Sequence, residues 1–326
     1  MISHSAEFAN VSFFLLIYEL TLNPDSGDVW LQPLKICMSK LALGTVQFGL
    51  PYGIANRIGQ VQPNEVREML RIARANAIDT LDTAVDYGES ESVLGHIGVS
   101  HFNIVSKLPS FFGDISTVNE WVKNQSAASL ERLGLGHHAA LVLHRPRQLL
   151  EVNGVALYQA LWQLKARGLC HKIGISVYSP VELDDILSKF DFDLVQLPFN
   201  LLDRRFLSSG WLQKLKDKGI EVHTRSTFLQ GLLLMPAHER PTKFGMWREL
   251  WAKWDDWITH SGLSRMHACM AYVLGIEGID KVVIGADSPM QLVEIIESGI
   301  FQSKLDIPDL TCQDERLINP SNWGLL

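Results

Sequence analysis

The sequence lacks the patterns that define several large classes of proteins. Its four cysteines, Cys37, Cys170, Cys269 and Cys312, lie far apart, and no C-x-x-C pair exists. This spacing argues against a zinc knuckle or a disulfide framework, and it favours a reducing, cytoplasmic compartment without a metal site. The net charge is −7, and acidic and basic residues are interleaved. No basic arm therefore indicates nucleic acid as a partner.

No hydrophobic run is long enough to span a bilayer. The longest apolar stretch near the N-terminus, SFFLLIYEL, is interrupted by Glu19 and is too short for a membrane helix. No Lys or Arg precedes it, so it also lacks the charged start of a secretory signal. We expect no membrane partner. Residues 1–37 are predicted to be an upstream extension, poorly ordered or outside the core, with Met38 as the natural start. Residues 38–326 are predicted to form one domain with a C-terminal tail.

Short apolar runs bounded by turn residues recur along this domain and predict eight strands. They are Lys40–Thr45, Ile78–Ala84, Asn103–Leu108, Ala139–His144, Lys172–Ser176, Leu194–Leu197, Ile220–Ser226 and Lys281–Ala286.

Segments with helical periodicity separate these runs. They are Pro63–Ala75, Thr117–Leu133, Val155–Arg167, a helix after Ser179, Leu212–Lys218, Trp247–His260, Met266–Leu274 and a helix from Ser288 to Gly299. Thr117 and Glu120 predict a capping box, and Ser179 and Ser288 each precede a proline at a helix start. A longer insertion, Leu232–Phe244, follows the seventh strand.

The strict alternation of strands and helices predicts the fold class. Alternating β and α units form parallel sheets, and eight such units favour an α/β fold of the (β/α)8 TIM-barrel type. No G-x-G-x-x-G follows the first strand, which argues against an open, doubly wound sheet. With 326 residues and 47% hydrophobic content, the chain is large enough to fill a barrel core.

Four polar residues lie where such a barrel carries its chemistry. Asp82, Lys107 and His144 end three successive strands, and Tyr87 lies in the loop after Asp82. Because function in a barrel lies at the carboxyl ends of the strands, we expect these side chains to converge. Lys107 can pair with Asp82 and lower the pKa of the Tyr87 phenol, which then exchanges a proton near neutral pH. His144 can orient a carbonyl oxygen.

The motif around these residues, DTAVDYGESESVLG, matches the pattern D-x-A-x-x-Y-G-x-x-E-x-x-L-G of the aldo-keto reductases. The resemblance continues in order through IVSKLP, LVLHRP, IGISVYSP, VQLPFNLLDRR, RSTFLQGLLL and VVIGADSPMQLVE. Residues 39 to about 300 therefore resemble a bacterial aldo-keto reductase, a barrel oxidoreductase that uses NAD(P)(H) on a small carbonyl or sugar substrate.

The resemblance also implies roles for individual residues. Tyr87 would be the general acid, Lys107 held by Asp82 would lower its pKa, and His144 would position the carbonyl. Residues near the other strand ends would bind the nicotinamide dinucleotide: Gly44, Thr45, Ser176, Gln196, Arg225, Ser226, Leu229, Gly231, Gly285, Ala286, Ser288 and Gln291.

Three departures from the family pattern concern this cofactor. Val177 replaces the usual Asn after Ser176, and Ile295 replaces an Asn that contacts adenine. Asp287 stands where the family often places a Lys or Arg for the 2′-phosphate of NADP. The family favours NADP(H), whereas a carboxylate at this position repels a phosphate and makes NAD(H) a possibility.

Substrate specificity is expected in the loops after strands 1, 4 and 7 and in the tail Phe301–Leu326. Four aromatic residues follow strand ends and are candidates for pocket walls or for the core: Phe48, Tyr52, Phe199 and Phe228. Three tryptophans at helical spacing predict a packed helix face: Trp247, Trp251 and Trp254.

Three functions remain open on the sequence alone. The first is an NAD(P)-dependent oxidoreductase, and the second is a nucleotide-binding regulatory subunit with the same fold and little turnover. The third is an aldolase that uses Lys107 as a Schiff base, which the neighbouring Asp82 disfavours because a charged, paired amine is a poor nucleophile.

Overall fold

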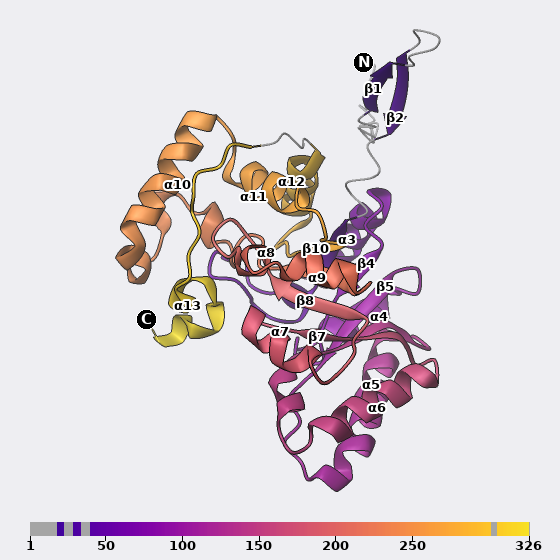
Figure 1. Ribbon diagram of the computed structural model, residues 1–326. Coiled ribbons are helices and arrows are strands. Elements are labelled where there is room, and N and C mark those ends of the chain that lie inside the picture. The colour runs from indigo at the N-terminus through magenta and orange to yellow at the C-terminus, as the bar shows by residue number, and fades with distance from the viewer. Residues whose placement is uncertain (1–17, 23–28, 34–39, 301–304, 326) are drawn as a thin grey trace, which may run out of the picture.

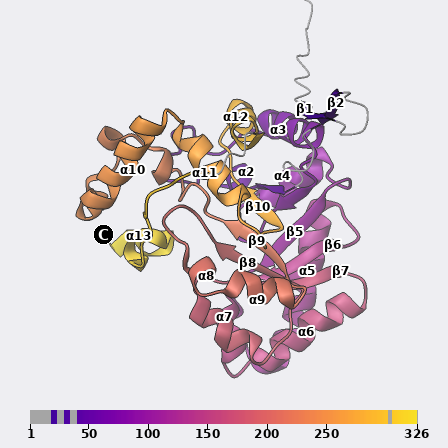
Figure 2. The same ribbon diagram turned by 45° about the horizontal axis from the view of Figure 1, so that its top comes forward.

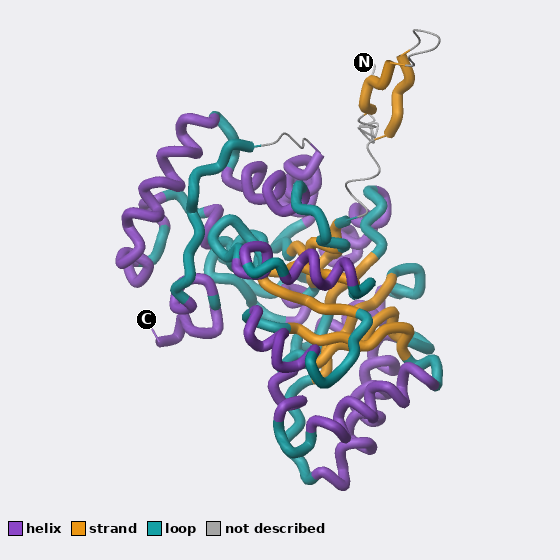
Figure 3. The backbone as a smooth tube through the Cα atoms, viewed as in Figure 1, coloured by secondary structure: helices purple, strands orange, loops and turns teal. Residues whose placement is uncertain are grey.

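Eight parallel strands close into a barrel in the computed structural model, which describes residues 18–22, 29–33, 40–300 and 305–325. The last strand pairs with the first and with the seventh, and this pairing closes the ring. The strands are β3 (Leu41–Gly44), β4 (Thr80–Asp82), β5 (Asn103–Leu108), β6 (His138–Leu143), β7 (Cys170–Ser176), β8 (Leu194–Pro198), β9 (Glu221–Arg225) and β10 (Lys281–Ile284). Figure 3 shows them at the centre, with helices around them. The predicted (β/α)8 TIM barrel is confirmed.

Helices connect the strands and cover the outside of the barrel (Figure 1). The α-helices are α2 (Val46–Gly49), α3 (Pro63–Ala75), α4 (Ser90–Ile97), α5 (Val118–Leu133), α6 (Gly154–Ala166), α7 (Pro180–Leu187), α8 (Arg205–Ser208), α9 (Trp211–Asp217), α10 (Arg248–Ser261), α11 (Arg265–Leu274), α12 (Pro289–Ile300) and α13 (Glu315–Ile318). The 3-10 helices are η1 (Ile115–Thr117), η2 (Pro146–Leu150), η3 (Leu232–Leu234), η4 (Ala237–Glu239), η5 (Thr242–Trp247) and η6 (Pro320–Leu325). None of the helices in the described parts combines the length and apolar character needed to cross a membrane.

The apolar side chains form two buried clusters. A large cluster lies between the strands and the helices, and it includes Met69 and Leu70 on the buried face of α3. A small cluster of Val105, Ala140, Val142 and Leu194 comes from β5, β6 and β8. Side chains alternate between the two faces of a strand, so one set fills the barrel interior while the other faces the helices.

The capping residues show why several helices begin where they do. The Ser179 Oγ accepts a hydrogen bond from the Glu182 amide at 3.3 Å, and the Ser288 Oγ accepts one from the Gln291 amide at 3.2 Å. The capping box predicted at Thr117 is wrong. The Thr117 hydroxyl instead donates to the Asp114 carbonyl at 2.8 Å, because the short helix η1 occupies the turn before α5.

Two strands of the N-terminal region were not predicted. β1 (Tyr18–Leu22) and β2 (Val29–Pro33) pair antiparallel and form a sheet separate from the barrel. The other residues of the predicted extension 1–37 lie outside the described residues. The assignment of Met38 as the natural start stays a prediction.

The C-terminal tail meets the insertion that follows β9. The Trp323 ring lies edge-on to the Phe244 ring at 5.0 Å, and Lys243 Nζ donates to the Trp323 carbonyl at 2.8 Å. Figures 1 and 2 both show α10 and α13 on one side of the barrel and α5 and α6 together on another. Two of the segments expected to determine specificity, the loop after β9 and the tail, thus pack against each other.

A buried carboxylate joins the opening motif to α5. Glu91 in α4 is 1% exposed and accepts hydrogen bonds from Ser106 at 2.6 Å and Ser129 at 2.7 Å. Arg132 forms an ion pair with its other oxygen at 2.6 Å. A buried carboxylate is tolerated only when such partners satisfy it, so Glu91 fixes α4, β5 and α5 relative to one another.

Replacing Glu91 with alanine is expected to destabilise the fold, because two buried hydroxyls and one guanidinium lose their acceptor. The free energy of unfolding should fall by about 3 kcal/mol. Urea denaturation followed by circular dichroism measures this change. The matched control is Glu89→Ala, an exposed position two residues earlier, which should stay within about 0.5 kcal/mol of the parent protein. Equal effects of the two substitutions would contradict the assigned role.

Candidate active site

A pocket opens at the carboxyl ends of the barrel strands. Ten of the residues predicted for the site line it: Gly44, Thr45, Asp82, Tyr87, Gln196, Arg225, Ser226, Gly231, Gly285 and Gln291. Six others do not: Lys107, His144, Ser176, Leu229, Ala286 and Ser288. Lys107 and His144 each contact Tyr87, and Ser176 contacts Gln196, so these three lie directly behind the lining.

The centre of the site is an ion pair between neighbouring strands. Lys107 Nζ lies 2.5 Å from Asp82 Oδ1 and 2.9 Å from the Thr83 carbonyl oxygen. Both charged side chains are at least 95% buried. Burial lowers the pKa of Lys107 below its usual value, although Asp82 opposes this shift. Because its amine is enclosed and already bonded, Lys107 is badly placed to attack a substrate carbonyl.

Tyr87 lies over this pair. Lys107 Nζ is 5.0 Å from the centre of the Tyr87 ring, and the His144 ring meets that ring edge-on at 5.9 Å. The four residues that the sequence placed at different strand ends are therefore brought together.

The pKa of Tyr87 does not follow the sequence prediction. It is raised well above the usual value of 10.0, first by removal of the phenol from water and then by the charge of Asp82. Asp82 neutralises the Lys107 charge that was expected to lower the pKa of Tyr87. Burial lowers the pKa of His144 to about 3, with further contributions from Lys107, Arg225 and Arg145. At neutral pH the phenol keeps its proton and the imidazole is uncharged.

A close backbone approach holds the Tyr87 loop. A Cβ atom on Gly49, at the end of α2, would lie 1.8 Å from the Tyr87 carbonyl oxygen. That oxygen also accepts a hydrogen bond from the Ser90 amide at 3.1 Å. Only glycine fits at position 49, and the position of Tyr87 depends on this contact.

A buried amide connects Asp82 to β7. Gln196 Nε2 donates to Asp82 Oδ2 at 2.7 Å, and Gln196 Oε1 accepts from Ser176 Oγ at 3.3 Å. Both oxygens of Asp82 are thus bonded, one to a cation and one to an amide. The residues expected to bind a carboxamide belong to the same network as the ion pair.

The opposite end of the pocket contains polar residues that sequence reasoning did not identify as site residues. Gln47 and Asn56 line it together with Asp287. Asn56 Nδ2 donates to Asp287 Oδ1 at 3.4 Å, and the Asp287 amide donates to Gln291 Oε1 at 2.6 Å. Burial raises the pKa of Asp287, although Gln47 opposes this shift. Gln47 lies in α2 and Asn56 in the segment between α2 and α3, and the sequence pattern assigned neither of them a role in the site.

The candidate aromatic residues divide between the pocket and the core. Tyr52 and Phe228 line the pocket. Phe48 is fully buried in the large core cluster, and Phe199 stacks on Tyr272 with ring centres 5.7 Å apart. The predicted helix face is confirmed for two of the three tryptophans, Trp251 and Trp254, which are buried in α10.

Comparison with known proteins agrees with this geometry. The model of the Aldo/keto reductase family matches residues 40–311. The chain belongs to the aldo/keto reductase family.

Several solved structures share the fold of this chain. A Pseudomonas aeruginosa protein assigned to the aldo-keto reductases is 21% identical, with a TM-score of 0.59 over 80% of this chain and 89% of the other. An aldo-keto reductase from Bacillus halodurans is 18% identical. Its holo form has a TM-score of 0.60 over 86% and 90% of the two chains, and its apo form 0.62 over 82% and 88%. At these identities the likeness concerns the fold alone. No match to the chain was found among curated proteins.

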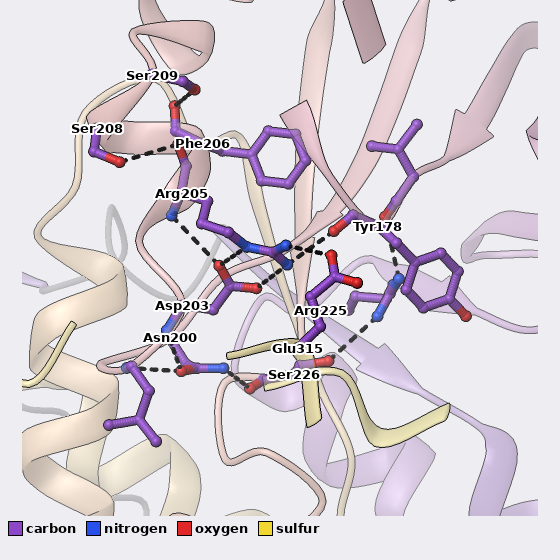
Figure 4. A network of polar contacts seen from close by, with 12 residues as sticks. Tyr178, Asn200, Asp203, Arg205, Phe206, Ser208, Ser209, Arg225, Ser226 and Glu315 are labelled. Atoms are coloured by element: carbon purple, nitrogen blue, oxygen red, sulfur yellow. Dashed lines mark hydrogen bonds and ion pairs between the residues drawn. The ribbon is translucent and has the colours of Figure 1, made fainter. Parts of the chain in front are cut away.

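In this aldo/keto reductase, the loop after β7 is held by the loop after β8 and by the tail. Figure 4 shows Arg205 between Asp203, Glu315 and the backbone of Tyr178. Arg205 binds Asp203 Oδ1 at 2.8 Å, Glu315 at 2.9 Å and the Tyr178 carbonyl oxygen at 2.9 Å. The Arg225 guanidinium lies 4.4 Å from the centre of the Tyr178 ring. Tyr178 is thereby fixed beside the pocket.

The two tyrosines of this site should ionise in opposite directions from the ordinary value. Burial alone would raise the pKa of Tyr178, but Arg225 and Arg145 lower it below 10.0, whereas Tyr87 titrates well above 10.0. In an ultraviolet titration of tyrosinate, Tyr178→Phe should remove absorbance that appears below pH 10. Tyr87→Phe should change nothing until the pH is well above 10, with circular dichroism monitoring the fold. The reverse order would contradict the described electrostatics.

Proposed function

We propose that this protein is an NAD(P)(H)-dependent oxidoreductase that reduces the carbonyl of an aldehyde, ketone or sugar to an alcohol, or catalyses the reverse reaction. One observation carries the proposal. A neutral phenol at a pocket lies over a buried Lys–Asp pair and beside an uncharged imidazole. This arrangement supplies a proton donor, a charge that stabilises the resulting tyrosinate, and a group that orients the carbonyl.

The pocket has features that suit a bound dinucleotide. Gln47 Oε1 lies at its wall, buried and without a hydrogen-bond partner among the described residues. A Cβ atom on Gly285 would lie 2.5 Å from Gln47 Nε2, so glycine at this position lets the Gln47 amide lie against the backbone at the pocket wall. The loop after β9 holds Ser226, Leu229 and Gln230 at positive φ, a strained conformation that is typical of ligand-binding loops.

The residues proposed to hold this cofactor follow the strand ends. Ser176 and Gln196 would bind the nicotinamide carboxamide, with Gly44, Thr45 and Arg225 against its ring. Ser226, Leu229 and Gly231 would line the pyrophosphate path, and Gly285, Ala286, Ser288 and Gln291 would hold the adenosine end. The cofactor, when bound, supplies or accepts the hydride.

In reduction, Tyr87 would deliver the proton. Its raised pKa keeps the phenol protonated until negative charge develops on the substrate oxygen. As the proton leaves, the phenolate comes under the influence of the Lys107 ammonium, which Asp82 and Gln196 hold in place. His144, whose pKa of about 3 keeps it uncharged, would donate a hydrogen bond to the carbonyl oxygen.

The family pattern favours NADP(H), and the charge of the pocket lining supports NAD(H) as the alternative. Arg225 is the one Lys or Arg among the described residues that line the pocket. The far end carries the Asp287 carboxylate instead, which would repel the 2′-phosphate of NADP. Asp287→Asn removes this charge and keeps the size of the side chain.

The first test is Tyr87→Phe, which removes the hydroxyl and leaves the ring over Lys107. Cofactor binding, followed by quenching of reduced-dinucleotide fluorescence, should stay unchanged. Carbonyl reduction should fall by at least about a hundredfold, the usual contribution of a general acid. Wild-type turnover by this variant would refute the assignment of the proton donor. If the parent protein binds the dinucleotide but reduces nothing in a broad carbonyl panel, the regulatory-subunit alternative is favoured.

The second test compares the two cofactors. In Asp287→Asn, the ratio of kcat/KM for NADPH to that for NADH should rise by about tenfold, because one repelled charge is removed. The control is Asp256→Asn, a substitution of a carboxylate on α10 that is 76% exposed, which should leave the ratio unchanged. An unchanged ratio in Asp287→Asn would show that the side chain at position 287 does not discriminate between NADPH and NADH.

A further inference from the structure

The substrate side of Tyr87 is bordered by two arginines. His144 contacts the Tyr87 ring, and Arg145 follows His144 in the chain. Arg145 lies 5.6 Å from the centre of the Tyr178 ring, and Arg225 lies 4.4 Å from it. Arg225 lines the same pocket as Tyr87. Both guanidinium groups therefore lie against the Tyr178 ring, at the edge of the pocket that Tyr87 and Arg225 line.

Neither arginine has a carboxylate partner among the residues that the structure describes. Arg145 is exposed and donates only to the Tyr178 hydroxyl, at a long distance of 3.4 Å. Arg225 donates to the Val177 carbonyl at 3.1 Å and to Ser226 Oγ at 3.4 Å. In contrast, Arg205, Arg240 and Arg265 are each paired with an aspartate. A guanidinium has five N–H donors, and stacking on a ring leaves its edge available.

The electrostatic potential around the Tyr178 ring and the two arginines is positive. Arg145 and Arg225 both contribute to the low pKa of His144 and to the lowered pKa of Tyr178. The nearest carboxylates do not cancel this charge by pairing. Asp82 is already bonded to Lys107, and Glu182 binds the Tyr178 amide at 2.8 Å. Asp86 is exposed and forms no ion pair among the described residues, and burial raises its pKa although Arg145 opposes the rise.

We propose that Arg145, together with Arg225, binds an oxyanion on the substrate, so that the preferred substrate is a carbonyl compound bearing a carboxylate or phosphate group. This inference rests on the proposed function, because it assigns the substrate class of the same site. Planar guanidinium groups bind carboxylate and phosphate oxygens through pairs of N–H donors. A neutral aldehyde would leave both guanidinium groups without an anionic partner.

The decisive variant is Arg145→Gln, measured with matched aldehydes that differ only in charge. One pair is succinic semialdehyde and butanal, and the other is glyceraldehyde phosphate and glyceraldehyde. The parent protein should use the anionic member of at least one pair with a kcat/KM at least about tenfold higher, because charge-assisted bonds are the strong ones. Arg145→Gln should lose most of that advantage, mainly through KM, and should keep its activity on the neutral member.

The matched control is Arg147→Gln, two residues further along the same loop, where an exposed arginine has no ring contact to Tyr178. It should behave as the parent protein with all four aldehydes. The pair in which the anionic aldehyde is preferred, carboxylate or phosphate, would identify which oxyanion the arginines bind. Equal efficiency on charged and neutral aldehydes, or an equal loss on both in Arg145→Gln, would overturn the inference.

A binding experiment separates this inference from the proposed function. In calorimetric titrations, γ-hydroxybutyrate should bind more tightly than butanol, and Arg145→Gln should abolish the difference. Added salt should weaken the binding of the anion, since the arginine is exposed. If no aldehyde is reduced but γ-hydroxybutyrate still binds in an Arg145-dependent way, the proposed function fails and the oxyanion site stands. If the two alcohols bind alike, the oxyanion site fails whatever the turnover.

Discussion

The site depends on an ion pair that would be costly anywhere else in the chain. Moving an ammonium and a carboxylate out of water costs several kcal/mol for each ion, and their mutual attraction offsets this only when the remaining hydrogen bonds are made. Here the Thr83 carbonyl accepts from Lys107, and the Gln196 amide donates to the second oxygen of Asp82. The register of β4 against β5 brings the two charges together, and closure of the barrel brings β8 within reach. The ion pair and all of its hydrogen-bond partners therefore come together only when the barrel is closed.

The same pair explains why the phenol keeps its proton. A lone lysine under Tyr87 would favour tyrosinate, but burial raises the pKa of the phenol, and the carboxylate bonded to that lysine raises it further. In the proposed reaction, Tyr87 would therefore hold its proton at neutral pH and release it only when a stronger base forms beside it. Asp82 adds to the effect of burial on the phenol, and the lysine would stabilise the tyrosinate that proton transfer leaves behind.

The fold was predictable because the sequence patterns that mark strands and helix starts are local. The apolar period placed every strand of the barrel within two residues of its observed ends, and Ser179 and Ser288 marked helix starts through their own hydrogen bonds. Thr117 shows the limit, since the preceding 3-10 turn engaged its hydroxyl. Gln47 and Asn56 could not be found in this way, because they join the pocket through contacts with residues near position 287 that no spacing reveals. The pKa of Tyr87 was misjudged for a related reason, since a shift that depends on burial and on the surrounding charges requires the positions of these groups.

The pocket carries opposite charges at its two ends, and this asymmetry bears on both proposals. Arg225 and Arg145 make the end near Tyr87 positive, while Asp287 makes the far end negative. Under the two proposals, an anionic substrate would be attracted to the first end and repelled from the second, and so would be steered toward Tyr87. A dinucleotide without a 2′-phosphate would avoid the repulsion at the far end. The two arginines lie after β6 and at the end of β9, whereas the carboxylate lies after β10. Substrate choice and cofactor choice should therefore be separable by mutation.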